Sequence, residues 1–299
     1  MNATVRIPPT IRDRAHQLVE GLSRVLGNGV DPSDPSNRDP EFIEKTALPI
    51  LRLLFKYYFR VEYEGVENIP QKGPFIVVAN HNGGPILPDS WMMLTYWWKT
   101  YGTDRPGYAA VHDLPFRIPI VKTFLCKVGA VKAGRESARR VLDMDGPLVI
   151  YPGGTEDCFK SFWKRHKICF ENRNGFIQMA LEKSVPVLPV VSTGGHEVYF
   201  TLFSSRKLAR WTGLSRWARM KCCPVNLGLP WGIWMTGFLP YLPLPSKMRF
   251  KVGTLIHLDP PSSQAANNGY VEACYRRVVD VMQGMLDELA QERRWPVLG

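Results

Sequence analysis

Short apolar runs alternate with amphipathic stretches from about residue 61 onward, a pattern typical of an α/β domain. The runs that predict strands are 74–80, 129–133, 146–154 and 185–191. The stretches that predict helices are 89–100, 136–143 and 172–183, and a last strand near 249–255 precedes a helix over 271–292. We therefore expect an α/β fold with a mostly parallel central sheet flanked by helices. Its functional loops should follow the carboxyl ends of the strands.

Two amphipathic segments precede this domain. Apolar residues recur at helical spacing from Ile11 to about Leu26, and residues 44–59 form a second apolar and basic helix. A stretch rich in Pro, Asp and Ser at 27–40 is typical of a linker. Each helix is suited either to packing on the core or to lying on a membrane. We expect an N-terminal helical segment over 1–60 and the α/β domain over 61–299.

Residues 222–246 contain no charged side chain. Their length would suffice to cross a membrane, but five prolines would interrupt a spanning helix. Tryptophans and cations lie just upstream, between Lys207 and Lys221. The segment is therefore predicted to be an interfacial membrane-binding patch, with Trp rings at the lipid headgroups, or else a loop that covers the sheet.

Composition and charge narrow the class of partner. The 299 residues are 45% hydrophobic and 22% charged, which indicates a folded chain. Lys and Arg number 38 against 27 Asp and Glu, and this excess favours an anionic partner. We expect no nucleic-acid partner, because the chain carries no recognisable nucleic-acid-binding module. The six cysteines lack zinc spacing and the chain begins without an apolar signal core, so we expect no metal and a cytosol-facing location.

The first candidate site follows a predicted strand. The strand ends at His81, a glycine pair follows at Gly83 and Gly84, and Asp89 begins the next predicted helix. An imidazole with a nearby carboxylate suits a general base, because the carboxylate fixes the ring tautomer. The glycines allow close backbone approach and can offer N–H groups to an oxyanion. The simpler alternative is a loop histidine beside an unrelated helix cap.

Two further clusters lie at later strand ends. Arg135 sits among cations at a predicted helix start, where free N–H groups favour phosphate. Gly153 and Gly154 are followed by the acidic Glu156 and Asp157. Such glycines let a ligand touch the backbone, and a carboxylate accepts a substrate hydroxyl. A solvated basic face and an ordinary tight turn with a charged rim are the alternatives.

Taken in order, these motifs resemble those of the glycerolipid acyltransferase superfamily, which contains the lysophosphatidate acyltransferases. The resemblance covers roughly residues 64–257. It implies an acyl-CoA-dependent O-acyltransferase in which His81 removes the proton of the acceptor hydroxyl and Asp89 orients His81. The alkoxide then attacks the thioester directly. Acyl-CoA is thus implied as a co-substrate, and no cofactor is implied.

The resemblance extends to three later blocks. Arg135 matches the arginine of the second block, which is usually assigned to phosphate binding. Gly153 and Gly154 match the third block, and residues 185–191 match the fourth. The implied substrate-binding residues are Gly83, Gly84, Arg135, Gly153, Gly154, Glu156, Asp157 and Arg173.

Two features depart from the common family pattern. Seven residues separate His81 from Asp89 where four are usual, and the third block reads Tyr-Pro-Gly-Gly-Thr-Glu instead of Phe-Pro-Glu-Gly-Thr-Arg. Glu156 therefore stands where an arginine for an acceptor phosphate is expected. Together with Arg173 and the Gly-Gly-His-Glu at 194–197, this is more similar to the neutral-lipid branch that includes diacylglycerol acyltransferases.

The expectation is an enzyme that transfers a fatty acyl group from acyl-CoA to the hydroxyl of a membrane lipid, with a neutral glycerolipid or other lipid alcohol favoured. It would act on the cytoplasmic face of a membrane, as a peripheral or monotopic protein on an anionic surface. One alternative is a lysophospholipid or lysophosphatidate-type acyltransferase with a phosphate-bearing acceptor. Another is a non-catalytic lipid-binding protein of the membrane surface.

Overall fold

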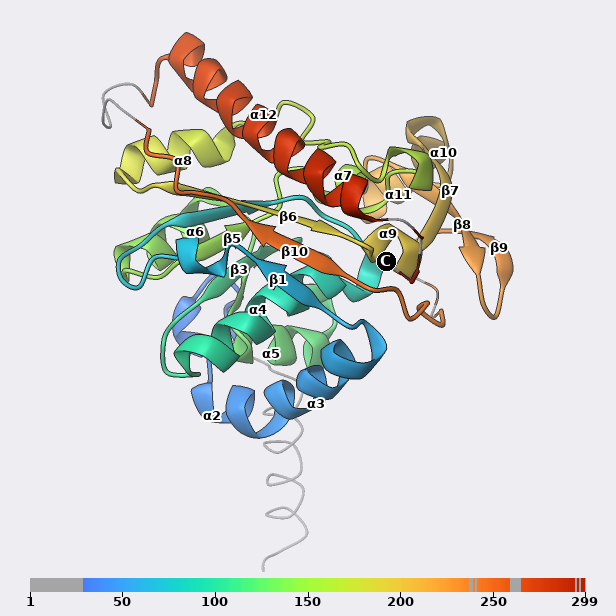
Figure 1. The fold of residues 1–299 in the computed structure, drawn as a ribbon, viewed down its shortest axis with the longest axis horizontal. Helices are drawn as coiled ribbons and strands as arrows, with labels where there is room; N and C mark the ends of the chain where they lie inside the picture. Colours follow the sequence, from blue (N-terminus) through green and yellow to red (C-terminus); the bar gives the residue numbers. More distant parts are fainter. Residues whose placement is uncertain are drawn as a thin grey trace, which may run out of the picture.

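A seven-stranded sheet forms the centre of the molecule (Figure 1). The computed structural model describes residues 29–236, 239, 241–258, 265–293, 295 and 297–298, so the helix expected up to Leu26 lies outside the described residues. The strand order is β1-β10-β6-β2-β5-β3-β4. The strands are β1 (Glu62–Glu64), β2 (Ile76–Ala79), β3 (Tyr108–Val111), β4 (Ala130–Lys132), β5 (Leu148–Ile150), β6 (Val187–Thr193) and β10 (Arg249–Val252).

Five of these strands are parallel neighbours, from β6 through β2, β5 and β3 to β4. β10 runs antiparallel to β6, and β1 runs parallel to β10. The predicted α/β class with a mostly parallel sheet is therefore confirmed. The strands predicted in runs 74–80, 129–133, 146–154 and 185–191 are also present, as β2, β4, β5 and β6.

Helices cover both faces of the sheet (Figure 1). The longer ones are α4 (Pro88–Tyr101), α5 (Pro119–Lys127), α6 (Arg135–Asp143), α8 (Gly175–Lys183) and α12 (Asn268–Glu292). Alternate residues of β2 point to opposite faces: Ile76 and Val78 pack with α8 and α12, while Val77 and Ala79 pack with α4. All four residues of β2 are buried, as expected for a parallel sheet covered on both sides.

A helical run over residues 40–58 packs on the α4 side of the sheet. It comprises α2 (Pro40–Phe42), η2 (Ile43–Ala47), α3 (Leu48–Leu53) and η3 (Leu54–Tyr58). One side of this run is buried in the same core as α4, whereas Ile50, Leu53 and Tyr57 are exposed. The segment therefore packs on the core and still presents an apolar ridge outward. None of the described helices is both long and apolar enough to cross a membrane.

A second, three-stranded sheet stands beside one end of the first (Figure 1). Its order is β7 (Phe200–Ser205), β8 (Cys223–Gly228), β9 (Gly232–Met235), all antiparallel, with α10 (Arg206–Trp211) and α11 (Leu214–Trp217) between β7 and β8. About half of the uncharged segment 222–246, from Cys223 to Met235, is therefore a β-hairpin, and residues 241–246 form an irregular stretch. The prolines of the hairpin are compatible with strands, because Pro224 lies near the start of β8 and Pro230 lies in the turn.

Short turns complete the chain and several of them build the site. They are η1 (Pro35–Asn37), η4 (Val66–Asn68), η5 (Gly84–Ile86), η6 (Pro115–Arg117), α7 (Gly154–Cys158), η7 (Phe162–Lys164) and α9 (Gly195–Val198).

Candidate active site

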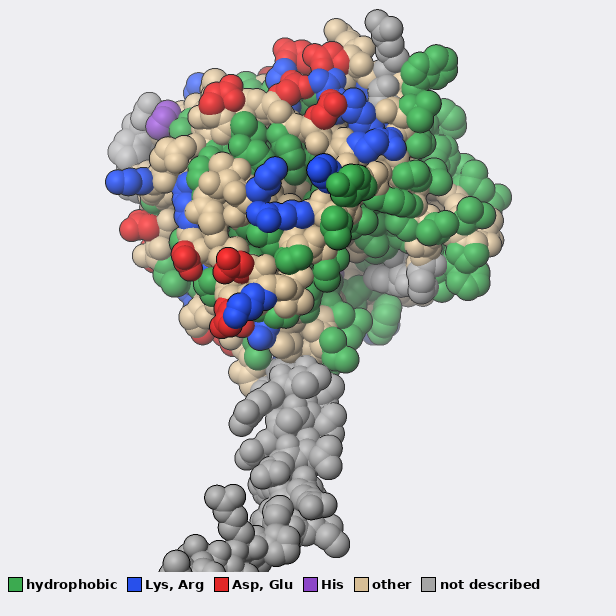
Figure 2. All heavy atoms as spheres, turned by 60° about the horizontal axis from the view of Figure 1, so that its bottom comes forward, with side chains coloured by type: hydrophobic (Ala, Val, Ile, Leu, Met, Phe, Trp, Pro, Cys, Tyr) green, Lys and Arg blue, Asp and Glu red, His purple; other side chains and the backbone are tan. Residues whose placement is uncertain are grey.

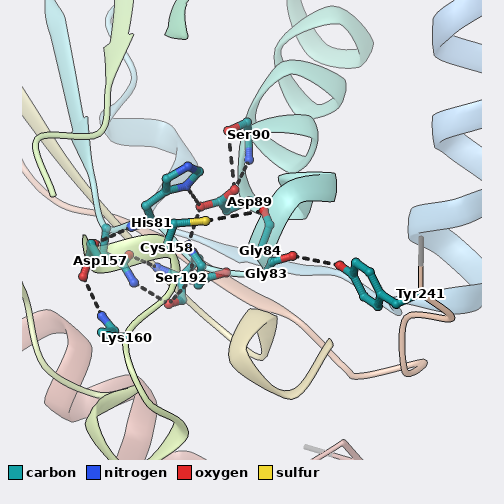
Figure 3. A network of polar contacts seen from close by, with 12 residues as sticks. His81, Gly83, Gly84, Asp89, Ser90, Asp157, Cys158, Lys160, Ser192 and Tyr241 are labelled. Atoms are coloured by element: carbon teal, nitrogen blue, oxygen red, sulfur yellow. Dashed lines mark hydrogen bonds and ion pairs between the residues drawn. The ribbon is translucent and has the colours of Figure 1, made fainter. Parts of the chain in front are cut away.

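Three neighbouring parallel strands end at the same edge of the central sheet, and the segments that follow them converge there. The residues after β2 run through Asn80 and His81 to η5, β5 leads through Tyr151 into α7, and β6 leads into α9. Figure 3 shows the polar side chains that these segments bring together. This is the edge at which open α/β sheets place their ligands.

His81 and Asp89 form the centre of this cluster. The ring Nδ1 of His81 lies 2.7 Å from Oδ2 of Asp89. The same carboxylate accepts the backbone N–H of Asn82 at 2.8 Å and that of Ser90 at 2.7 Å. Asp89 is buried in the first turn of α4, where the partial positive charge of the helix end favours a carboxylate. The seven intervening residues fold into a tight turn with η5, so the longer spacing still brings the two groups together.

The environment of His81 determines its charge. Burial by itself lowers the pKa of His81, but the Asp89 carboxylate and the Cys158 sulfur together outweigh that effect, and the pKa lies well above its ordinary value of 6.5. The Tyr151 ring lies against the imidazole, with ring centroids 4.4 Å apart. Figure 3 shows the second ring nitrogen pointing away from Asp89. With Nδ1 hydrogen-bonded to a carboxylate, the neutral ring presents Nε2 as the proton acceptor.

Asp157 and Lys160 hold the backbone beneath His81. The Oδ2 atom of Asp157 accepts the backbone N–H of His81 at 2.6 Å, and its Oδ1 lies 2.7 Å from Nζ of Lys160. Lys160 also donates to the carbonyl of Lys167 at 2.6 Å, and both charged side chains are buried. Asp157 was expected to contact substrate, whereas both of its oxygens are engaged by the protein. Lys160 was not singled out in the sequence, and its place three residues after Asp157 was the available signal.

A buried amide and hydroxyl network joins the His81 loop to β6. Ser192 donates its N–H to Oδ1 of Asn80 at 2.8 Å, and Nδ2 of Asn80 donates to the Ser192 carbonyl at 3.0 Å. Nδ2 of Asn82 donates to Oγ of Ser192 at 2.8 Å. The two asparagines therefore fix the backbone on both sides of His81. The Asn-His-Asn run was visible in the sequence, but its partner on β6 was not.

Close packing around the loop after His81 requires glycine at positions 83 and 84. Both have positive φ, and a Cβ at Gly84 would lie 2.4 Å from the ring of Tyr199. The carbonyl of Gly83 accepts the Tyr241 hydroxyl at 3.2 Å, and that of Gly84 accepts the Cys158 thiol at 3.4 Å. Because the peptide group is planar and trans, the Gly84 N–H points away from Tyr241.

Glu156 and Arg173 brace the Gly153–Gly154 turn. Glu156 is buried and forms ion pairs with Arg173 and, at 3.2 Å, with Arg206. Arg173 also donates to the carbonyl of Gly153 at 2.6 Å. The structure thus places these four predicted residues together, next to Asp157, and engages their charged groups with one another.

Arg135 lies apart from this network. It begins α6 after β4, at the edge of the sheet, whereas His81 follows the central β2. Its guanidinium faces α8, where it hydrogen-bonds Gln178 and lies 3.8 Å from Glu182. The residues that the structure describes include no group of three or more His, Cys, Asp or Glu side chains arranged to hold a metal ion.

Several known proteins are similar to this chain in sequence. Residues 60–193 match the family model described as Acyltransferase. An uncharacterized protein of Mycobacterium tuberculosis is 31% identical over 239 residues, which cover 79% of this chain and 63% of the relative. A Bos taurus protein named "DGAT1/2-independent enzyme synthesizing storage lipids" is 26% identical over 227 residues, 76% of this chain and 59% of that protein.

Among solved structures, the 1-acyl-sn-glycerophosphate acyltransferase PlsC of Thermotoga maritima aligns with a TM-score of 0.49 and 21% identity, over 93% of this chain and 94% of that one. This chain covers less than two thirds of the length of the mycobacterial and bovine relatives. The family-model match and the named relatives agree with the motifs found in the sequence. The resemblance to the glycerolipid acyltransferase superfamily is thus confirmed over residues 60–193, which match the Acyltransferase family model.

Proposed function

We propose that this chain transfers a fatty acyl group from acyl-CoA to the hydroxyl of a lipid acceptor. The observation that carries the proposal is the 2.7 Å contact between His81 Nδ1 and Asp89 Oδ2 at the carboxyl end of the central strand β2. Asp89 holds one ring nitrogen in its protonated form, so the other can take the proton of an acceptor hydroxyl. His81 is then the general base and Asp89 orients it.

The transfer proceeds in one displacement. His81 Nε2 takes the hydroxyl proton as the acceptor oxygen bonds to the thioester carbonyl carbon. The carbon–sulfur bond then breaks, and the CoA sulfur leaves with the proton returned from His81. We assign the Gly84 N–H, which points away from Tyr241, to the carbonyl oxygen that becomes negative in the transition state. The net charge of +11 suits the anionic phosphates of CoA.

We propose a neutral glycerolipid or another lipid alcohol as the acceptor. The cations considered for an acceptor phosphate already have partners, since Arg135 faces Gln178 and Glu182 and Arg173 is paired with Glu156. The name of the bovine relative, which refers to storage lipids, points in the same direction. Because the acceptor is a lipid, we place the protein on the cytoplasmic face of a membrane, as a peripheral or monotopic protein.

Substitution of Arg135 separates this acceptor from a phosphate-bearing one. With a neutral acceptor, Arg135→Gln should leave the acceptor KM within about twofold of wild type, because an exposed ion pair contributes little. A rise of about tenfold or more in the acceptor KM, with an unchanged KM for acyl-CoA, would instead identify a phosphate-bearing acceptor, since a charge-assisted contact to phosphate is worth about 1.5–3 kcal/mol.

Turnover of radiolabelled acyl-CoA with extracted membrane lipids, with the products identified by mass spectrometry, tests the activity itself. His81→Ala should lower kcat by a factor of about 10²–10⁴, the usual contribution of a general base. His257→Ala is the matched control, because His257 is exposed and distant in sequence from the site. If wild type forms no acylated lipid, the catalytic proposal fails and the lipid-binding alternative remains. If His81→Ala turns over as fast as wild type, the protein is an acyltransferase and the assignment of His81 as its base fails.

A further inference from the structure

The outward face of the β7–β8–β9 sheet is apolar. The cross-strand row Thr201, Asn226 and Trp234 is buried against the rest of the protein. Neighbouring residues along each strand therefore point outward. Among them are Leu227 and Ile233, which pair across β8 and β9 and are 45% and 68% exposed. An antiparallel sheet with one face in water carries polar residues there, and this sheet does not.

The turn of the hairpin enlarges this surface. Leu229 and Trp231 are 60% and 51% exposed at the turn between β8 and β9. We call the outward side chains together the apolar face: Phe203, Leu227, Leu229, Trp231, Ile233 and Met235. Figure 2 shows hydrophobic side chains gathered over the side of the molecule where Figure 1 places β8 and β9, with Lys and Arg side chains at the border. A continuous apolar surface of this kind marks an interaction site.

Positive charge flanks the apolar face. From Val198 to Leu258 the sequence contains nine Lys and Arg residues and no Asp or Glu. The helices α10 and α11, which directly precede β8, expose Lys207, Arg210 and Arg216. Trp211, at the end of α10, is 80% exposed. Arg206 of α10 is paired with Glu156 and Glu171, whereas Lys207, Arg210 and Arg216 are exposed. Exposed Trp, apolar side chains and these three cations match the chemistry of a lipid headgroup region above acyl chains.

We propose that the apolar face docks on the surface of an anionic lipid bilayer, with the α10 and α11 cations against lipid phosphates. This inference deepens the proposed function and rests on its lipid acceptor. A second copy of the chain fits the charges less well, because a two-fold contact through this face would bring the cationic flanks of both copies together. A bilayer with negative headgroups supplies both the apolar and the anionic part.

The docked surface would lie next to the catalytic loop. Tyr199, whose ring packs against Gly84, directly precedes β7. Tyr241, which follows β9, donates its hydroxyl to the carbonyl of Gly83. A bilayer on the apolar face therefore presents its lipids beside the loop that carries His81.

Cosedimentation with vesicles of phosphatidylcholine and phosphatidylglycerol tests the docking. The double variant Leu227→Gln/Ile233→Thr removes two outward side chains while Thr keeps the strand preference of Ile. We expect its partition coefficient to fall by about tenfold or more, because each buried CH₂ contributes about 0.8 kcal/mol. Met144→Gln is the matched control: Met144 is also exposed but lies after α6, and this variant should bind as wild type does. Circular dichroism and the thermal midpoint verify that both variants fold.

A second variant tests the charged part. Lys207→Gln/Arg210→Gln should bind pure phosphatidylcholine vesicles as wild type does and lose at least about tenfold on phosphatidylglycerol, at about 1 kcal/mol per cation. The proposal is overturned if the Leu227/Ile233 variant binds vesicles as tightly as wild type. It is also overturned if the apolar face instead mediates a dimer, seen as a wild-type dimer, a monomeric variant and equal vesicle binding in light scattering and cosedimentation.

Turnover in detergent separates this proposal from the proposed function. With the acceptor dispersed in detergent micelles, the Leu227/Ile233 variant should keep wild-type kcat, and it should lose activity only on vesicles. A wild-type protein that binds vesicles but acylates no lipid in either form would overturn the acyltransferase activity and leave the docking intact. A protein that is active on micelles but never binds anionic vesicles would overturn the docking and leave the acyltransferase activity intact.

Discussion

Asp89 sets both the orientation and the pKa of His81, so its substitution should leave a characteristic pH signature. Wild-type kcat/KM should rise as pH increases through the raised pKa of His81, because the base must be neutral. Asp89→Asn should lower kcat by a factor of about 10²–10⁴ and move this rise to lower pH, since the carboxylate that raises the pKa is gone.

A pH–rate profile of the two proteins measures this shift. Ser90→Ala serves as the control, because it keeps the Asp89 carboxylate and the 2.7 Å backbone N–H contact and removes only the longer hydroxyl contact at 3.4 Å. An Asp89→Asn profile that keeps the wild-type pH dependence would contradict the assignment of His81 as the titrating base.

The Asp157–Lys160 pair is a second feature whose role can be measured. Asp157→Asn removes the negative charge and leaves the buried Lys160 ammonium without its partner. The free energy of unfolding should fall by about 3–5 kcal/mol, as for other buried pairs that lose one member. Urea denaturation measures the change.

The double variant Asp157→Asn/Lys160→Met distinguishes an unpaired charge from a simple packing defect. It removes the stranded ammonium and should regain most of the lost stability. If the double variant is as unstable as the single one, the loss comes from the hydrogen bond to His81 or from packing, and not from the buried charge.

For single residues, the sequence indicated which side chains carry the chemistry but not which residues hold them in place. His81 and Asp89 could be proposed because a histidine at a strand end and a carboxylate at a helix start lie close in sequence. The groups that fix the loop come from far along the chain: Ser192 and Tyr241 lie more than 100 residues beyond it. Asp157 was predicted to bind substrate, and its two oxygens contact the backbone N–H of His81 and Nζ of Lys160. No local pattern shows that a carboxylate will turn toward a distant backbone N–H.

Among the secondary-structure elements, the turn from β5 into α7 is tightly packed. A Cβ at Gly153 would lie 2.2 Å from Cβ of Asp157 and 2.6 Å from the carbonyl oxygen of Cys169. Gly153→Ala should therefore reduce the free energy of unfolding by about 1–3 kcal/mol through overpacking, and disturb the Asp157 contact to His81 as well.

Gly134→Ala is the matched control for Gly153→Ala. Gly134 precedes α6, its φ is not in the left-handed region, and nothing lies within 4 Å of an added Cβ. Its stability should stay within about 0.5 kcal/mol of wild type. Equal stability of the two variants in urea denaturation would show that the β5–α7 turn relaxes without cost.

Sequence periodicity predicted several helices well, including α4, which has no exposed residue from Pro88 to Trp98. The stretches 89–100, 136–143 and 271–292 correspond to α4, α6 and α12 within a few residues. The hairpin of β8 and β9 was not predicted, because its outward residues are as apolar as its inward ones and the alternation that indicates a strand is missing. The same absence of alternation is what distinguishes the apolar face from an ordinary solvent-facing sheet.

Across the whole molecule, the half-buried His166 and the buried His196 make stability depend on acid. Burial and neighbouring cations lower the pKa of His166 to about 4, and burial lowers that of His196 well below 6.5. Between about pH 6.5 and pH 4 the unfolded chain therefore binds more protons than the folded one, and stability should fall as pH falls. His81, with its raised pKa, contributes no opposing slope in this window and loses its contribution only above pH 6.5.

Thermal midpoints at pH 7 and pH 5 measure this effect. His166→Gln should show a smaller drop between the two values than wild type, because one of the groups that must take up a proton is gone. A drop of the same size in the variant would show that His166 does not contribute to the acid sensitivity.

The overall architecture followed from the order of strands and helices, and the acid-free stretch after Val198 was visible in the composition. The sequence did not show which residues share one surface. Leu227 and Ile233 are six residues apart, and only the register of β8 against β9 shows that they stand side by side. The residues that form a binding surface depend on such strand registers, whereas the net charge indicates only the sign of a partner's charge.

Tyr241 stands where two parts of the molecule meet. Its hydroxyl is hydrogen-bonded to Gly83, and its own segment continues into the exposed Leu242 and Leu244. A contact that orders this segment from outside therefore also orders the Gly83–Gly84 peptide, whose N–H we assign to oxyanion stabilisation. Contact of Leu242 and Leu244 with a lipid surface would thus order the Gly83–Gly84 peptide at the same time as it brings an acceptor close to the His81 loop.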